Sequence, residues 1–217
     1  MKKTGGQIVC ESLILEGVDV IFGIPGGAIL PLYQTLSGYP ELRHILTRHE
    51  QGASMAADGY ARITGKVGVC MATSGPGATN LITGLATAQM DCVPMVAITG
   101  QVGRAAIGKD AFQETDVTGV SLPVTKHNYL VTSADQIAST IKEAFYIANT
   151  GRPGPVLIDI PKDVFTEETE FNYPETVSLP GYITDTEVDQ LQVQKAANLI
   201  SEAKRPLILA GHGVIIS

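Results

Sequence analysis

The sequence lacks the features that direct a protein to nucleic acids or to an oxidising compartment. No block rich in Lys or Arg occurs and the net charge is −7, so the positive patch that phosphate backbones require is missing. Cys10, Cys70 and Cys92 show no CxxC spacing and lie in apolar segments. An odd set of this kind is typical of reduced core thiols and not of a disulfide framework.

Long hydrophobic runs are also absent. The apolar runs at 93–98 and 206–210 are far shorter than the roughly 20 residues of a membrane span, and the first residues lead into no signal-type apolar core. The composition, 44% hydrophobic and 17% charged, is ordinary for a folded enzyme domain. We therefore expect a soluble, cytoplasmic protein with no nucleic-acid or membrane partner.

Apolar runs of strand length alternate with helix-length patterns, which predicts βαβ units around a parallel sheet. Strands are expected near residues 18–22, 42–47, 67–72, 95–99, 129–131 and 156–160, and helices over 4–16, 28–36, 51–63, 78–90 and 133–148. The last helix is expected to start with a capping box of Ser133 and Gln136 and to stop at Gly151. The predicted fold class is α/β, with helices on both faces of a parallel sheet.

The chain is expected to contain one complete domain and the start of another. Residues 166–185 lose the periodicity and collect Glu, Thr and Pro, a composition typical of an exposed linker. We therefore assign residues 1–165 to the first domain and 186–217 to a second α/β domain that is cut short. In the second, residues 186–203 have a helical pattern and 205–213 are expected to form a strand that runs into a Gly-rich turn.

Two Gly-rich loops follow predicted strands. The segment from Gly75 to Asn80 opens a helix, but Asn80 replaces the third glycine of the dinucleotide fingerprint, and no P-loop motif occurs. Gly23 to Gly27 lies in a similar place after the first strand. Either loop alone is equally consistent with a tight turn, but several at the carboxyl ends of strands favour a ligand site in that crevice.

Metal and nucleophile sites are not indicated. The four histidines, His44, His49, His127 and His212, have no spacing suited to zinc. Ser74 lacks the preceding glycine of a nucleophile elbow. We expect no metal ligands in this chain.

The motifs, taken in order, resemble one enzyme family. They are Gly23-Ile24-Pro25-Gly26-Gly27-Ala28, Arg48-His49-Glu50-Gln51, Thr73-Ser74-Gly75-Pro76-Gly77-Ala78-Thr79-Asn80, Thr99-Gly100-Gln101-Val102, Asp110-Ala111-Phe112-Gln113-Glu114, and Gly151-Arg152-Pro153-Gly154-Pro155-Val156 with Asp159-Ile160-Pro161-Lys162-Asp163. The ordered set resembles the acetohydroxyacid synthase (acetolactate synthase) catalytic large subunit, in its N-terminal thiamine diphosphate-binding (pyrimidine) domain. The resemblance covers nearly the whole chain.

The resemblance implies a carboligase reaction. Pyruvate loses CO2 and is joined to a second 2-keto acid, giving 2-acetolactate, or 2-aceto-2-hydroxybutyrate from 2-ketobutyrate, the first common step of branched-chain amino acid biosynthesis. The cofactors implied are thiamine diphosphate, Mg2+ and FAD, the last without net redox chemistry. Glu50 would hydrogen-bond N1′ of the aminopyrimidine and favour its imino tautomer. Without the resemblance, Glu50 is equally a carboxylate at a helix N-terminus, where the dipole favours it.

The resemblance also assigns the other candidate site residues. Glu50, Gly27 and Gln113 would be catalytic, with the Gly27 N–H near the reacting carbon and Gln113 facing the substrate; Glu50, Pro25, Gly26, Thr73, Gly77 and Asn80 would bind the cofactor, Arg152 would contact FAD, and Phe112 and Lys162 would line the substrate channel. Arg152 and Lys162 are otherwise solvated charges near a domain edge. Ile24 and Gly103 depart from the residues common in the family, Tyr and Pro, which leaves inhibitor sensitivity open.

The sequence contains no Gly-Asp-Gly motif with a downstream Asn pair, which in this family holds Mg2+ and the diphosphate. We therefore expect a homodimeric parent enzyme, with a small regulatory subunit as a further partner, and expect this chain alone to be inactive. Four alternatives stay open: a pyruvate oxidase, a 2-keto acid decarboxylase, a catabolic acetolactate synthase without FAD, and a non-catalytic α/β binding module.

Overall fold

The computed structural model of the chain describes residues 1–184 and 187–216. These residues form two compact units, Met1–Gly181 and Tyr182–Ser217. No helix among the described residues is long and apolar enough to cross a lipid bilayer.

The first unit is built on one sheet of six strands. In chain order they are β2 (Val20–Gly23), β3 (Arg43–Leu46), β4 (Gly68–Ala72), β5 (Met95–Gln101), β6 (His127–Leu130) and β7 (Pro155–Pro161). The spatial order is β3-β2-β4-β5-β7-β6, and every neighbouring pair is parallel. The predicted α/β fold class is confirmed, with six strands where the apolar runs indicated them.

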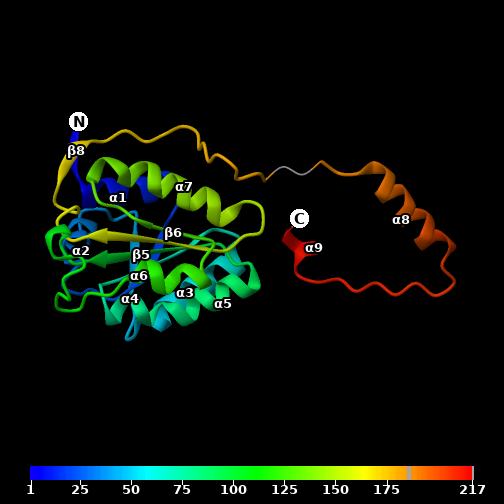
Figure 1. Cartoon of the computed structure of the whole chain (residues 1–217), viewed down its shortest axis with the longest axis horizontal. Helices are drawn as coiled ribbons and strands as arrows, with labels where there is room; N and C mark the ends of the chain where they lie inside the picture. The colour runs from blue at the N-terminus through cyan, green and yellow to red at the C-terminus, as the bar shows by residue number, and fades with distance from the viewer. Residues whose placement is uncertain (185–186, 217) are drawn as a thin grey trace. The chain divides into compact units, whose positions relative to one another are not determined.

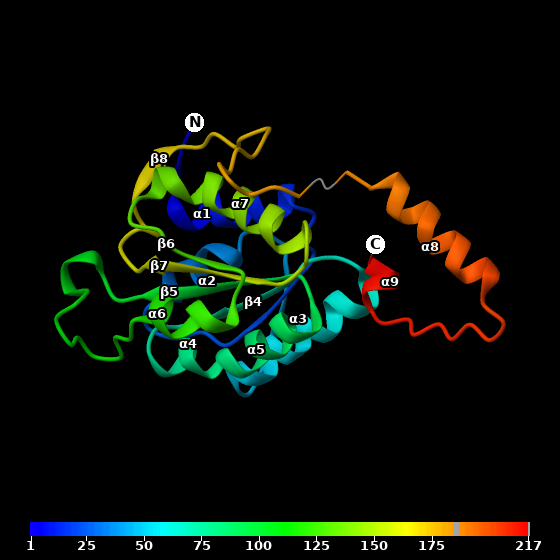
Figure 2. The same ribbon diagram turned by 45° about the vertical axis from the view of Figure 1, so that its right-hand side comes forward.

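Helices cover both faces of this sheet (Figures 1 and 2). The helices α1 (Gly5–Leu15), α2 (Leu30–Leu36) and α7 (Ile137–Asn149) contribute to one apolar cluster, and α3 (Glu50–Thr64), α5 (Ile82–Asp91) and α6 (Val117–Ser121) contribute to the other. The short α4 (Pro76–Asn80) directly precedes α5 and adds Ala78 to the second cluster. Short 3-10 helices are η1 (Arg104–Ala106), η2 (Leu122–Val124) and η3 (Ala134–Gln136).

The residues of β4 show how the sheet separates the two clusters. Val69 and Met71 belong to the cluster on the α1 side, whereas Cys70 and Ala72 belong to the cluster on the α3 side. This alternation follows from the period of two along a strand. Gly68 lets α3 approach closely, since a Cβ there would lie 2.2 Å from the carbonyl oxygen of Ala57. The central strands are buried on both faces, as parallel strands between helices are.

Two expectations about helix ends need correction. The capping box at Ser133 is wrong, because the Ser133 hydroxyl and the Ala134 N–H both donate to Glu167 Oε1, each at 3.2 Å. Helix α7 begins after η3 with Gln136 as its N-cap, and no side chain caps it. The predicted helix over 78–90 is divided into α4 and α5 at Leu81. At Ser133, the carboxylate of Glu167, which is distant in sequence, thus takes the place of the predicted local cap.

A small antiparallel pairing, not expected from the sequence, closes the first unit. Strand β1 (Lys2–Thr4) pairs with β8 (Glu168–Glu170). Beyond β8, Phe171, Tyr173 and Leu179 pack against the first apolar cluster. The unit therefore extends past residue 165, the expected end of the first domain. The expected boundary between residues 185 and 186 lies outside the described residues.

The second unit contains two helices, α8 (Gln190–Glu202) and α9 (Gly213–Ile216), in its described part. Helix α8 falls within the predicted helix at 186–203, whose residue 186 lies outside the described residues, and Asp189 caps it. The strand expected at 205–213 is wrong: residues 206–211 have no regular structure. A strand is stabilised by hydrogen bonds to a neighbour, and the described part of this unit offers none.

Candidate active site

The loops at the carboxyl edge of the sheet carry most of the predicted site residues. Parallel strands end at one edge, so the segments after β2, β3, β4 and β5 gather there. They carry, in turn, Pro25 to Gly27, Glu50, Thr73 to Gly77, and Phe112 with Gln113. The segment between β5 and α6 (green) projects beyond this edge (Figure 2).

Glu50 is the first residue of α3 and is half-buried. Asn80, the last residue of α4, donates a hydrogen bond through Nδ2 to Glu50 Oε2 at 3.0 Å. A Cβ on Gly77 would lie 3.3 Å from Glu50 Oε1, so the other carboxylate oxygen lies next to a residue without a side chain. His49 caps the helix, accepting from Gln51 N–H at 3.1 Å through Nδ1. One oxygen of Glu50 is thus fixed by a neutral amide, and the other lies beside a glycine.

Thr73 holds the two Gly-rich turns together. Its hydroxyl oxygen accepts a hydrogen bond from Ala28 N–H at 3.1 Å. A Cβ on Gly26 would come within 2.5 Å of the Thr73 side chain, and one on Gly77 within 2.8 Å. Gly27 is exposed, and a Cβ on it would meet nothing within 4 Å. The structure thus brings Gly26, Thr73, Gly77, Asn80 and Glu50 together and leaves the Gly27 backbone open.

The segment with Gln113 rests on the turn after β4. Gly75 has φ 56°, and a Cβ on it would lie 2.4 Å from the carbonyl oxygen of Gln113. Gln113 itself has φ 57°, a left-handed conformation that is uncommon for a residue with a side chain. Phe112 is 87% exposed. Gln113 and Phe112 therefore stand at the site edge through a close backbone contact.

Several residues near this edge were missed from the sequence. The Tyr33 hydroxyl lies 3.2 Å from His44 Nε2. Burial, and secondarily the charges of Cys70 and Glu50, raise the pKa of Tyr33. The hydroxyl of Thr47 is buried and has no hydrogen-bond partner among the described residues, the kind of atom that a ligand or water satisfies. These side chains come from separate elements, so no local motif marks them.

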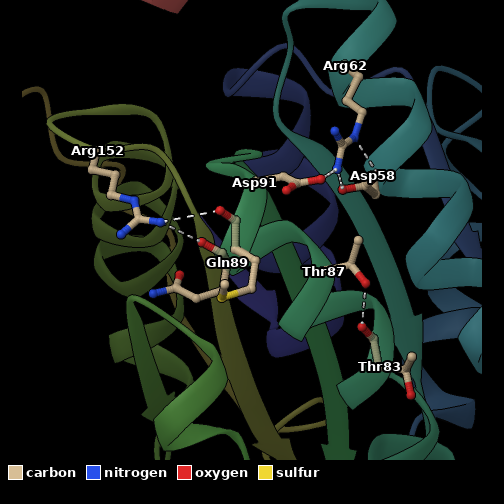
Figure 3. Close-up of polar contacts among 8 residues, drawn as sticks. Asp58, Arg62, Thr83, Thr87, Gln89, Asp91 and Arg152 are labelled. Carbon is tan, nitrogen blue, oxygen red and sulfur yellow. Dashed lines mark hydrogen bonds and ion pairs between the residues drawn. The ribbon is translucent and has the colours of Figure 1, made fainter. Parts of the chain in front are cut away.

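Lys162 and Arg152 lie at opposite ends of β7. Lys162 follows the strand and is exposed, and its backbone N–H donates to the carbonyl oxygen of Gln101 at 2.9 Å. Arg152 precedes the strand, so it lies at the amino edge, away from Glu50. Its guanidinium donates to the carbonyl oxygens of Gln89 and Met90 at 3.3 and 3.4 Å, at the end of α5 (Figure 3). The structure does not bring Arg152 together with the other site residues.

Among residues 1–184 and 187–216, no group of three or more His, Cys, Asp or Glu could hold a metal ion.

Comparison with known proteins gives a consistent family. Residues 3–120 match the model of the thiamine pyrophosphate enzyme, N-terminal TPP binding domain. The chain is 59% identical to an acetolactate synthase of Mycobacterium bovis over 98% of its own length and 34% of that protein. It is 54% identical to the acetolactate synthase large subunit of Corynebacterium glutamicum, over 99% of this chain and 34% of that one. A probable acetolactate synthase large subunit of Methanocaldococcus jannaschii is also 54% identical, over 98% of this chain and 36% of that one. The chain spans about a third of the length of these relatives.

Proposed function

This chain belongs to the thiamine pyrophosphate enzymes, and we propose that it forms the part of an acetolactate synthase large subunit that binds the aminopyrimidine ring of the cofactor. The reaction proposed is the condensation of pyruvate with a second 2-keto acid, pyruvate or 2-ketobutyrate, with loss of CO2. The observation that carries the proposal is the placement of Glu50 at the carboxyl edge, with Oε2 held by Asn80 and Oε1 beside Gly77.

The residues present fit the cofactor's ring. A carboxylate oxygen next to a glycine can be approached by a planar nitrogen base, because the glycine places no side chain there. Further polar groups at the same edge are the open backbone of Gly27 and the buried hydroxyl of Thr47, which has no hydrogen-bond partner among the described residues. Thiamine diphosphate supplies, when bound, a carbon nucleophile for a keto carbon and retains two carbon atoms of pyruvate after CO2 leaves.

The chain's own residues would hold protons and orient groups. Glu50 would share a proton with the ring nitrogen N1′ through one carboxylate oxygen. Asn80 donates to the other oxygen and thereby fixes the plane of the carboxylate. Because the Glu50 carboxylate is charged, its hydrogen bond to the ring would be stronger than one between neutral groups. Gln113 and Phe112 would contact the substrate, and Lys162 would lie at the entrance.

The remaining partners are proposed from the family alone. No group of three or more His, Cys, Asp or Glu among the described residues could hold a metal ion. Mg2+ would be held elsewhere in the enzyme, and we derive no step through it. FAD contact by Arg152 is likewise a proposal, because Arg152 is at the other edge of the sheet. A second copy of the chain would complete the site, and a small regulatory subunit fits the name "large subunit" of the relatives. We also propose that residues 1–165 form the cofactor-binding domain and that 166–185 link it to the next domain, with Phe171, Tyr173 and Leu179 of the linker packed back against it. The proposed location is the cytoplasm.

The test is acetolactate formation from pyruvate by the natural polypeptide that contains these 217 residues. It is supplied with thiamine diphosphate, Mg2+ and FAD, and wild type is compared with Glu50→Gln. We expect the variant to lose roughly 100-fold or more in kcat/KM, because a neutral amide cannot exchange a proton with the ring. The 217-residue chain assayed alone is expected to be inactive.

Each other outcome selects an alternative. Hydrogen peroxide as product would indicate a pyruvate oxidase, and free aldehyde a 2-keto acid decarboxylase. Full activity without FAD would favour a catabolic acetolactate synthase. Equal activity of wild type and Glu50→Gln would reject the role of Glu50, and no activity with any 2-keto acid would favour a non-catalytic module.

A further inference from the structure

Asp159 is a buried carboxylate that the proposed reaction does not use. It lies on β7, between Thr99 of β5 and Leu130 of β6 in the sheet register, and is 1% exposed. It accepts hydrogen bonds from Thr99 Oγ1 at 2.6 Å and from Gln101 Nε2 at 2.9 Å. The described residues give it no ion pair, although acidic side chains are almost never fully buried unless paired. Such a group calls for an explanation.

Gln101 connects this carboxylate to the loop that carries Phe112 and Gln113. The side-chain Nε2 of Gln101 donates to Asp159 and also to the carbonyl oxygen of Thr115, at 2.9 Å each. Its Oε1 accepts from the N–H of Val102, also at 2.9 Å. One buried amide therefore ties both ends of the segment 102–115. A carboxylate only accepts hydrogen bonds, so it directs the NH2 of Gln101 toward itself and Oε1 toward Val102.

The loop has hydrogen bonds of its own and borders a cavity. The carboxylate of Glu114 accepts from the N–H of Ala111 at 2.9 Å and from that of Gly108. Beneath the loop is a cavity of about 230 Å3, whose lining includes Gln101, Ile107, Glu114, Asp116, Leu130 and Asp159. The loop is also anchored by Arg104, which bonds Asp163 and the carbonyl oxygen of Thr132, and by the contact of Gln113 with Gly75. The bonds of Gln101 are the further ties at its two ends.

We propose that Asp159 is a positioning residue: through Gln101 it holds both ends of the loop 102–115, and its charge sets how readily this loop lifts from the site. This inference rests on the proposed function where it concerns the substrate, because Phe112 and Gln113 are the residues that would contact the 2-keto acid. That Asp159 holds the loop through Gln101 does not depend on the proposed function.

The sign of the charge effect follows from the surroundings of Asp159. Burial raises the pKa of Asp159 to about 6, against the hydrogen bonds from Thr99 and Gln101, and the charge of Asp116 adds to the rise. The titratable groups that share its cavity are Glu114 and Asp116, both acidic. Lifting the loop lets water reach Asp159 and returns its pKa toward the ordinary value. The closed loop is therefore favoured as the pH falls through about 6, and it opens more readily as the pH rises through that value.

The neutral form keeps both hydrogen bonds. A protonated Asp159 can donate to the Thr99 hydroxyl, which then accepts, while Gln101 still donates to the other oxygen. Asparagine reproduces this arrangement without a charge. Asp159→Asn should therefore close the loop at all pH values, whereas Asp159→Ala, which removes the acceptor, should loosen it.

The test is hydrogen exchange of the Val102 amide in the 217-residue chain, expressed as a protection factor so that the intrinsic pH dependence is removed. In wild type we expect protection to rise about tenfold from about pH 7.5 to about pH 5. Asp159→Asn should show the higher protection throughout with no pH step, and Asp159→Ala about tenfold lower protection at neutral pH. The amide of Ile98, inside the buried strand β5 that precedes Val102, serves as the reference for global unfolding.

Asp116→Asn is the matched control. It removes a charge from the same cavity, but Asp116 bonds Gly119 N–H and the Thr118 hydroxyl and not Gln101. In Asp116→Asn, the protection of the Val102 amide should still change with pH, but with its midpoint at a lower pH, because the charge that helps to raise the pKa of Asp159 is gone. Absence of a step in wild type, or equal changes at Val102 and Ile98 in the variants, would overturn the proposal.

The substrate part is tested on the natural polypeptide. Asp159→Ala should raise the KM for pyruvate about tenfold with kcat changed less than about threefold. An unchanged KM beside a loosened loop would overturn the substrate role. If wild type forms no acetolactate, the proposed function fails, and the exchange experiment, which needs no cofactor, still decides whether Asp159 holds the loop.

Discussion

Two regions at opposite edges of the same sheet are built in different ways. Among the candidate site residues at the carboxyl edge, backbone lies against backbone or a short side chain, as where Gly75 meets Gln113 and Gly26 meets Thr73. At the amino edge, charged side chains close helix ends: Arg62 of α3 bonds Asp58 and Asp91, and Arg152 bonds the last carbonyl groups of α5 (Figure 3).

The two regions should therefore respond differently to substitution. Glycine at close contacts leaves room for a ligand but allows no added atoms, so a substitution there causes steric clashes. Charged groups at helix ends interact with the helix dipole and the free carbonyl groups. Their loss removes an electrostatic interaction, which water partly replaces. The carboxyl edge should therefore respond sharply to added atoms, and the amino edge moderately to lost charges.

The largest effect on stability should come from an added methyl group at Gly75. Gly75→Ala places a Cβ 2.4 Å from the Gln113 carbonyl oxygen, and we expect the free energy of unfolding to fall by about 3 kcal/mol. Gly65→Ala is the matched control at the amino edge, because Gly65 also has positive φ but open space around it, and about 1 kcal/mol is expected. Urea denaturation followed by circular dichroism measures both. Equal losses would remove the contrast between the edges.

Asp58 should give the next largest effect. Its side chain is 10% exposed and receives two hydrogen bonds from Arg62, at 2.7 and 3.2 Å. Asp58→Asn should lower the free energy of unfolding by about 1–2 kcal/mol, since a charge-assisted bond to a buried acceptor is lost. Asp91, which bonds the same guanidinium at 2.8 Å, is 54% exposed, and Asp91→Asn should cost less than about 0.5 kcal/mol. A larger loss for Asp91→Asn than for Asp58→Asn would contradict the importance of burial.

Arg152→Ala tests whether this residue closes α5. Loss of the bonds to the last carbonyl groups should lower the free energy of unfolding by about 0.5–1 kcal/mol, and Arg152→Lys, which keeps the charge, should recover about half. In the natural polypeptide, FAD affinity is measured for the same variants. A loss of FAD affinity with no loss of stability would show that cofactor contact and not helix closure is the role of Arg152.

Glu50→Gln should have the smallest effect on stability. The amide can still accept from Asn80, and only the favourable charge at the start of α3 is lost, so we expect a change below about 0.5 kcal/mol. The same variant should nearly abolish acetolactate formation. A stability loss above 1 kcal/mol, measured by the same urea denaturation, would mean that Glu50 serves the fold more than the site.

Features that depend on neighbouring residues in the sequence were predicted well. The six strands and the helix over 51–63 follow from local periodicity, because the spacing of apolar residues within one short segment is enough to indicate a strand or a helix. Two expectations failed because they depended on groups distant in sequence. The Ser133 hydroxyl donates to Glu167 instead of capping the helix, and residues 206–211 have no neighbouring strand among the described residues. The position of Arg152 was available from the sequence, because a residue that precedes a strand lies at its amino edge.

The sequence by itself determined the alternation of strands and helices, the family motifs and the place of Glu50 at the start of a helix, because each depends on residues close together in the chain. Only the tertiary structure decided which of these groups meet. The Asn80 bond to Glu50, the contact of Gly75 with Gln113 and the link from Asp159 through Gln101 to Thr115 each join separate elements. Such contacts arise from strand order and packing, which fix distances between segments that local patterns leave free.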